Sequence, residues 1–130
     1  MAGGTRALHH LDLGVDDVDR AEGEWGWLLA ACGWQREDGV RSWVHPDGTY
    51  VFMEHSPDQH GEHDRLRPGI NHLALTVGTR AELDRMRTEA AGHGWQEMYV
   101  DRYPHAGGEQ HVALYVESSE GFEVEVVVGD

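Results

Sequence analysis

Two histidines stand at the start of nearly identical segments, and this repetition is the strongest indication of chemistry in the sequence. HLDLGV at 10–15 returns as HLALTV at 72–77. A duplicated unit that carries one histidine at the same place in each copy brings two imidazoles to one site across a pseudo-twofold axis, which is how many metal centres are made. The sequence therefore predicts a metal site that includes His10 and His72.

A second repeated segment indicates that the copies share the same elements. CGWQ at 32–35 returns as HGWQ at 93–96, an offset of 61 (93 minus 32) beside the offset of 62 (72 minus 10) between the histidines. Residues 7–15 and 71–77 alternate in polarity as half-buried strands do, and apolar residues at helical spacing follow each of them. The expected helix ends are Asp16 or Asp17 with Gly33 in the first copy, and the Thr79–Glu82 capping box with Gly94 in the second.

Short strands separated by turn residues are expected after each helix. They lie at 34–37, 40–45 and 49–55 in the first copy and at 95–101, 110–117 and 121–128 in the second. Each copy therefore reads βαβββ, which predicts an α+β fold in one domain, residues 1–130. Its parts are module 1 at about 7–56, a polar linker at 57–69 and module 2 at about 70–128.

Strand alternation selects the side chains that can line a cavity, because one face of each sheet must cover its helix and leaves the other face free. Glu123 beside Glu125 is expected to be a solvated charge. A single strand histidine is more often a surface residue than a ligand, but two imidazoles with two carboxylates form a good set for Ni, Co, Fe, Mn or Zn. The free faces are expected to carry His10, Glu54, His72, His111, Tyr115 and Glu125.

The order His, Glu, His, Glu at the first and last strand of each copy resembles the vicinal oxygen chelate superfamily. That superfamily includes glyoxalase I, methylmalonyl-CoA epimerase, extradiol dioxygenases and bleomycin resistance proteins. The resemblance covers residues 7–128 and implies paired modules whose sheets curl into a cup around a metal, usually in a homodimer. It implies that the metal ligands are His10, Glu54, His72 and Glu125.

The local match to this superfamily is strongest at the end of the chain. GFEVEV at 121–126 resembles the family's turn glycine followed four residues later by the ligand glutamate. SSEG at 118–121 departs from the Asp-Pro-Asp-Gly that many members carry there. The corresponding gap from Gly48 to Glu54 is two residues longer, which makes Glu54 the least secure ligand.

The resemblance implies an isomerase, lyase or epimerase of the glyoxalase type. A small substrate would chelate the divalent metal through adjacent oxygens, which would acidify a C–H beside a carbonyl and stabilise the enediolate. Glu54 or Glu125 would shuttle the proton, whereas His111 and Tyr115 would orient substrate, assist proton transfer or only form the cavity wall.

Two other functions remain open on the sequence. An extradiol dioxygenase would hold Fe(II) through His10, His72 and Glu125 and would not need Glu54. A metal-free antibiotic-binding protein of the bleomycin resistance kind would use the negative charge to attract a cationic drug, although such binders usually lose the four ligands.

Composition limits the partners of the protein. The chain has 24 acidic against 10 basic residues and a net charge of -14, so nucleic acid and anionic membranes are poor partners. No apolar run is long enough for a spanning helix, and the start lacks a signal-peptide pattern, so a cytoplasmic protein is expected.

Two further features have expected structural roles. Cys32 is expected to be a buried apolar residue rather than a nucleophile. The connection at 102–110 is either a lid or a surface loop.

Overall fold

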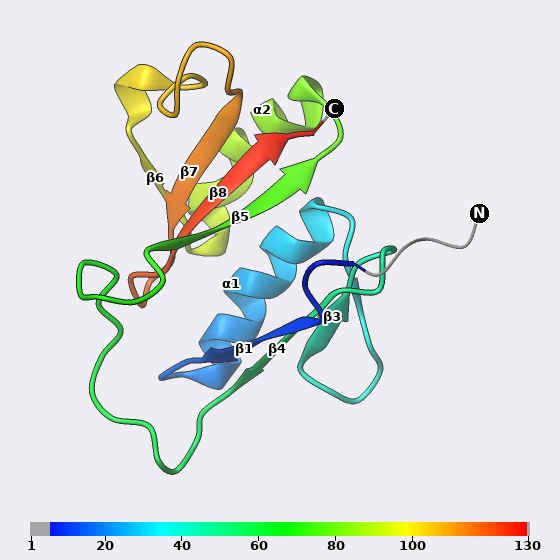
Figure 1. Cartoon of the computed structure of the whole chain (residues 1–130), viewed down its shortest axis with the longest axis vertical. Coiled ribbons are helices and arrows are strands. Elements are labelled where there is room, and N and C mark those ends of the chain that lie inside the picture. Colours follow the sequence, from blue (N-terminus) through cyan, green and yellow to red (C-terminus); the bar gives the residue numbers. More distant parts are fainter. Residues whose placement is uncertain (1–5, 130) are drawn as a thin grey trace. The chain divides into compact units, whose positions relative to one another are not determined.

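The computed structural model describes residues 6–129 and confirms the α+β class. The chain divides into two compact units, Met1–Gly61 and Glu62–Asp130, so the boundary falls inside the segment expected to be the linker. Each unit has one four-stranded sheet and one α-helix (Figure 1). The repeated sequence has therefore produced a repeated structure.

Unit 1 contains a mixed sheet in the order β1-β4-β3-β2, in which β1 runs parallel to β4 and the other pairs are antiparallel. The carboxylate of Asp17 caps the helix by accepting a hydrogen bond from the backbone N–H of Arg20 at 3.0 Å. Leu28 and Leu29 of the helix are fully buried, as is Val51 of β4. The elements of unit 1 are β1 (His10–Gly14), α1 (Val18–Ala31), β2 (Gln35–Arg36), β3 (Ser42–Val44) and β4 (Tyr50–Glu54).

Unit 2 repeats this topology as β5-β8-β7-β6, with β5 parallel to β8 (Figure 1). Helix α2 contacts β7 and β8, and Leu83, Val124 and Val126 are fully buried. Its elements are β5 (His72–Val77), α2 (Arg80–Glu89), the 3-10 helix η1 (Ala90–His93), β6 (Gln96–Met98), the 3-10 helix η2 (Val100–Arg102), β7 (Ala113–Glu117) and β8 (Glu123–Val128).

Several expectations about single residues can now be compared with the structure. Cys32 is buried at the end of α1, as expected. The prediction of a solvated Glu123 is wrong, because its side chain is 4% exposed and forms an ion pair with Arg65. The strand expected at 95–101 ends at Met98 and is followed by η2, and β7 begins at Ala113 rather than at 110. Among the described residues, no helix is long and apolar enough to cross a membrane.

The cap of α2 supplies a test of the local rules. Thr79 Oγ1 accepts a hydrogen bond from the Glu82 N–H at 3.1 Å, as expected, but the Glu82 carboxylate accepts from Gly78 N rather than from Thr79 N.

We predict that Thr79→Ala lowers the free energy of unfolding by about 1 kcal/mol, because the helix loses a capping acceptor. Urea unfolding measures this change, with Thr79→Ser as the control that keeps the hydroxyl. Equal stability of the two variants would contradict the prediction.

Candidate active site

Three predicted site residues meet on the free face of the second sheet. His72 Nε2 lies 3.2 Å from Glu125 Oε1, and His111 Nε2 contacts the other oxygen, Oε2. The Glu125 side chain is 8% exposed, whereas those of His72 and His111 are 35% and 40% exposed. Each oxygen of the buried Glu125 carboxylate thus contacts one imidazole nitrogen, and both imidazole rings remain accessible to small molecules.

Tyr115 lies beside this cluster on β7, opposite Glu125 in the strand register. Its ring packs edge-on against the His72 ring, with 6.2 Å between the centroids. Burial, followed by the negative charge of Glu125, raises the pKa of Tyr115 to about 12. The phenol is therefore a hydrogen-bond donor at neutral pH and not a base.

The connection before β7 covers part of the cluster. A Cβ atom added to Gly107 would lie 2.6 Å from His111 Cδ2 and 2.7 Å from Tyr115 Oη. Only a residue without a side chain lets the backbone approach these two rings so closely. The connection that the sequence left open as a lid or a surface loop therefore contacts two of the predicted site residues.

The strand register shows that the two copies are not equivalent at the predicted carboxylates. In unit 2, the residue two positions after His72 is Ala74, and it pairs with Glu125. In unit 1, the residue two positions after His10 is Asp12, and it pairs with Phe52. Phe52 is thus the register equivalent of Glu125, and Glu54 lies two residues farther along β4, which agrees with the longer gap after Gly48.

His10 and Glu54 have separate surroundings in unit 1. The His10 ring stacks on Tyr50 with 4.8 Å between centroids, and His10 Nδ1 lies 2.9 Å from His9 Nδ1. A hydrogen bond with Asp12, together with burial and the negative charge of that neighbour, raises the pKa of Glu54. Glu54 therefore binds a proton more readily than an isolated carboxyl group does, a property often found in acid–base residues of enzymes.

A pocket of about 620 Å³ adjoins Glu54 within unit 1. This volume is in the range of small-molecule sites. Two of the lining residues are cationic, but each already has an acidic partner: Arg36 with Glu22 at 2.7 Å and Arg41 with Asp19 at 2.9 Å. Phe52 and Val40 supply apolar lining. The pocket therefore offers Glu54 a neighbouring space of suitable size but no free cation.

The four-ligand set predicted from the sequence is divided between the units. His10 and Glu54 belong to unit 1, and His72 and Glu125 belong to unit 2. Within residues 6–129, no group of three or more His, Cys, Asp or Glu side chains is arranged to hold a metal ion. The structure therefore brings His72, His111, Tyr115 and Glu125 together, and the complete metal site stays a prediction.

Sequence reasoning missed two residues beside the predicted ones, Asp12 and Asn71, and a third, Arg65, that contacts Asn71. Asp12 is the partner of Glu54, and its place two residues after His10 on the same face was the available signal. Asn71 contacts His72, and Arg65 contacts Asn71 and Glu123. Both precede β5, and Arg65 lies in the expected linker, where no periodic pattern could connect it to the sheet.

Comparison with known proteins now decides the family. The profile of the Glyoxalase/Bleomycin resistance protein/Dioxygenase superfamily matches residues 9–115. The chain belongs to this superfamily. The resemblance inferred from the sequence is therefore confirmed, and the matched range includes all predicted site residues except Glu125.

Similar proteins support the superfamily and its fold over nearly the whole chain. The uncharacterized protein YqjT of Bacillus subtilis is 32% identical over 125 residues, which cover 92% of this chain and 97% of that protein. The crystal structure of a candidate glyoxalase from Bacillus halodurans is 31% identical, with a TM-score of 0.84, and covers 95% of this chain and 96% of that one. A fosfomycin resistance protein from Listeria monocytogenes shares the superfamily fold at 14% identity, with a TM-score of 0.62 and coverage of 98% and 96%.

The raised pKa of Tyr115 predicts how the protein behaves at high pH. An unfolded chain releases the phenolic proton near pH 10, and the folded protein keeps it to about pH 12. The protonated Tyr115 phenol therefore contributes fully to the free energy of unfolding below pH 10, and this contribution is lost as the pH rises from 10 to about 12. Tyrosinate absorbance during alkaline titration measures the pKa directly. Tyr115→Phe should remove one high-pH transition and leave that of Tyr103, whose pKa is also about 12.

Gly107→Ala tests the contact between the connection and the site. We expect the added methyl group to displace the His111 and Tyr115 rings, because both predicted distances are shorter than non-bonded atoms allow. Aromatic NMR resonances of these two residues report the displacement. Gly92→Ala is the matched control, since a Cβ there meets nothing within 4 Å. Unchanged resonances in Gly107→Ala would contradict the contact.

Proposed function

We propose that this protein is a metal-dependent enzyme of the isomerase, lyase or epimerase type. Its substrate is a small molecule that offers two adjacent oxygens to a divalent cation. The observation that carries the proposal is the meeting of His72 Nε2 with the buried carboxylate of Glu125 on a sheet face that no α-helix of unit 2 covers. The superfamily membership supports it.

The donor atoms present suit a divalent ion of the transition series. Imidazole nitrogen with carboxylate oxygen is favoured by Zn, Ni, Co, Fe and Mn. Glu125 holds one ring nitrogen at 3.2 Å, and a cation between the two groups would satisfy both. We propose that His72, Glu125 and His10 are the ligands, with His10 supplied by unit 1 of the same chain or of a second copy in a homodimer.

The other predicted residues receive roles from their surroundings. A bound divalent cation would supply Lewis acidity toward a carbonyl oxygen of the substrate. Glu54, whose pKa is raised by Asp12 and which lines the pocket, is proposed to move the proton at the reacting carbon rather than to bind the metal. Tyr115, a phenol with a pKa of about 12, is proposed to donate a hydrogen bond to a substrate oxygen. His111 is proposed to orient the Glu125 carboxylate through Oε2.

An extradiol-type dioxygenase is the second candidate, and the register favours it in one respect. Phe52 stands where a second carboxylate would mirror Glu125, which leaves two histidines and one carboxylate. This is the ligand set of many non-haem Fe(II) oxygenases. The nature of the metal and the need for Glu54 separate the two candidates.

Metal content of protein purified without a tag tests the proposal. We predict one tightly bound divalent ion, whose affinity falls roughly 100-fold or more in His72→Ala and Glu125→Ala because each removes a ligand. His60→Ala, a change at an exposed linker histidine, is the control and should leave the affinity unchanged. Absence of metal after reconstitution with Ni, Co, Zn, Mn and Fe(II) would overturn both enzyme candidates and leave a metal-free binding protein.

Glu54→Gln then distinguishes the candidates. The isomerase proposal predicts retained metal and a loss of about 100-fold or more in solvent-deuterium exchange at the C–H of α-hydroxycarbonyl compounds, since general acid–base catalysis contributes that much. The dioxygenase alternative predicts Fe(II) as the metal and ring cleavage of catechols that is unaffected by Glu54→Gln.

A further inference from the structure

We propose that Asn71 and Arg65 are positioning residues that hold the hydrogen of the His72 imidazole on Nδ1 and so leave Nε2 free for a cation. This inference rests on the proposed function, because it assigns the residues that prepare one metal ligand. Neither residue belongs to the repeated segments HLDLGV and HLALTV that first indicated the site.

The side-chain amide of Asn71 has one orientation that satisfies both of its neighbours. Asn71 Nδ2 donates to the backbone carbonyl of Arg65 at 3.2 Å, and Asn71 Oδ1 lies 2.8 Å from His72 Nδ1. A carbonyl only accepts, so the amide nitrogen must face Arg65 and the amide oxygen must face the ring. The ring nitrogen Nδ1 therefore carries the hydrogen and donates it to Asn71.

This tautomer determines what His72 presents to Glu125. In a neutral imidazole with hydrogen on Nδ1, Nε2 carries a lone pair. That lone pair faces Glu125 Oε1, which lies 3.2 Å away. Two acceptors at this distance repel each other unless a proton or a metal cation lies between them. The Asn71 contact thus converts the pair of His72 and Glu125 into two metal donors, in the way that outer hydrogen bonds orient ligating histidines.

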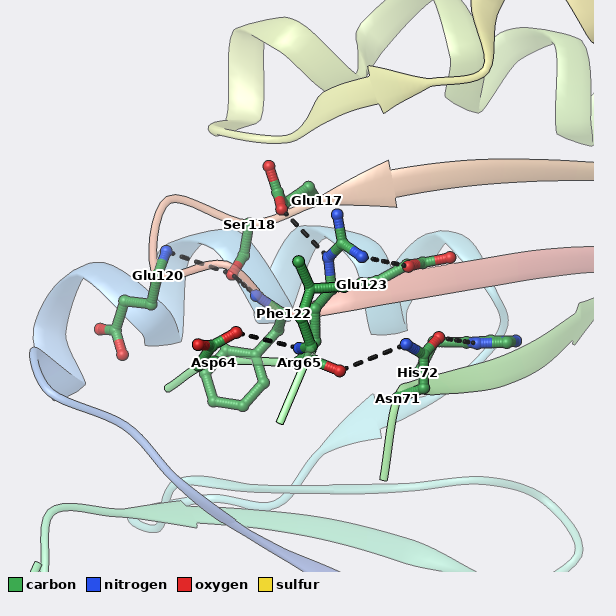
Figure 2. A network of polar contacts seen from close by, with 10 residues as sticks. Asp64, Arg65, Asn71, His72, Glu117, Ser118, Glu120, Phe122 and Glu123 are labelled. Atoms are coloured by element: carbon green, nitrogen blue, oxygen red, sulfur yellow. Dashed lines mark hydrogen bonds and ion pairs between the residues drawn. The ribbon is translucent and has the colours of Figure 1, made fainter. Parts of the chain in front are cut away.

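Arg65 holds the carbonyl on which this arrangement depends (Figure 2). Its guanidinium lies between two carboxylates, with Nε 3.3 Å from Glu117 Oε2 and Nη1 3.3 Å from Glu123 Oε1. The Glu123 side chain is 4% exposed, so removal of the guanidinium would leave a buried charge without its partner. The chain before β5 is therefore attached to β7 and β8, and its carbonyl is directed toward Asn71.

The first copy has a corresponding contact at the same place. His9 precedes His10 as Asn71 precedes His72, and His9 Nδ1 lies 2.9 Å from His10 Nδ1. In both units, the residue before the predicted ligand therefore contacts its Nδ1 nitrogen. The partner of His72 is an amide oxygen that only accepts, whereas either imidazole of the pair in unit 1 can donate, so the repetition concerns the place of the contact and not its direction.

NMR of the histidine ring nitrogens in the metal-free protein tests the tautomer without any metal. At a pH at which the ring is neutral, wild-type His72 should carry its hydrogen on Nδ1, with the signal identified by its loss in His72→Ala. Asn71→Leu removes both hydrogen bonds and should shift the population toward hydrogen on Nε2. Asn71→Asp keeps an acceptor for Nδ1 and should retain the wild-type tautomer, and Thr76→Val, on the exposed face of the same strand, should have no effect.

Co(II) affinity measured on the same proteins gives the second readout. We expect Asn71→Leu to weaken binding about 10- to 100-fold, Arg65→Gln to weaken it in the same direction, and Asn71→Asp and Thr76→Val to bind as wild type does. A wild-type His72 with hydrogen on Nε2, or an unchanged tautomer in Asn71→Leu, would overturn the inference. Wild-type protein that holds the Nδ1 tautomer but binds no metal would instead overturn the proposed function and leave the positioning contact established.

Discussion

The site depends on a simple constraint: each sheet has one α-helix, and one helix covers one face. Because successive side chains of a strand point to opposite faces, Val124 and Val126 can pack toward α2 only if Glu125 points the other way. The same alternation directs Glu54 away from Val51 and Met53, which are buried. Apolar packing therefore selects the polar face, and Glu54, Tyr115 and Glu125 are placed on it by buried neighbours on their own strands.

The two copies share this constraint but differ in register by two residues at the critical position. Two residues span about 7 Å along a strand, so Glu54 lies on the same sheet face as its register equivalent Phe52 but farther along its strand than Glu125 lies along β8. At that position its neighbour is Asp12 rather than a histidine, and the nearby acid raises its pKa. A small displacement along one strand has thus given the two carboxylates different neighbours, two imidazoles for Glu125 and a second carboxyl group for Glu54.

The fold and the sheet faces of several candidate residues could be predicted because both follow from local periodicity. Strand alternation predicted the free-face positions of Glu125 and Tyr115, and short-range capping rules predicted Thr79 and Asp17. The environment of Glu123 could not be predicted, because its partner Arg65 comes from a segment without periodicity. The register of β4 against β1 could not be predicted from the sequence either. The longer gap after Gly48 indicated an irregularity, but the hydrogen bonding between the strands determines which β4 residue pairs with which β1 residue.

The strand order also has a consequence for synthesis of the chain. In each sheet, the last strand to be made is an inner one: β4 lies between β1 and β3, and β8 lies between β5 and β7. Until β8 leaves the ribosome, β5 has no neighbour and β7 has one exposed edge, so both can pair with other chains. Parallel pairing of β5 with β8 also closes a long loop, which makes it slow. Molecular chaperones that shield strand edges should therefore matter most until β4 and β8 have been made.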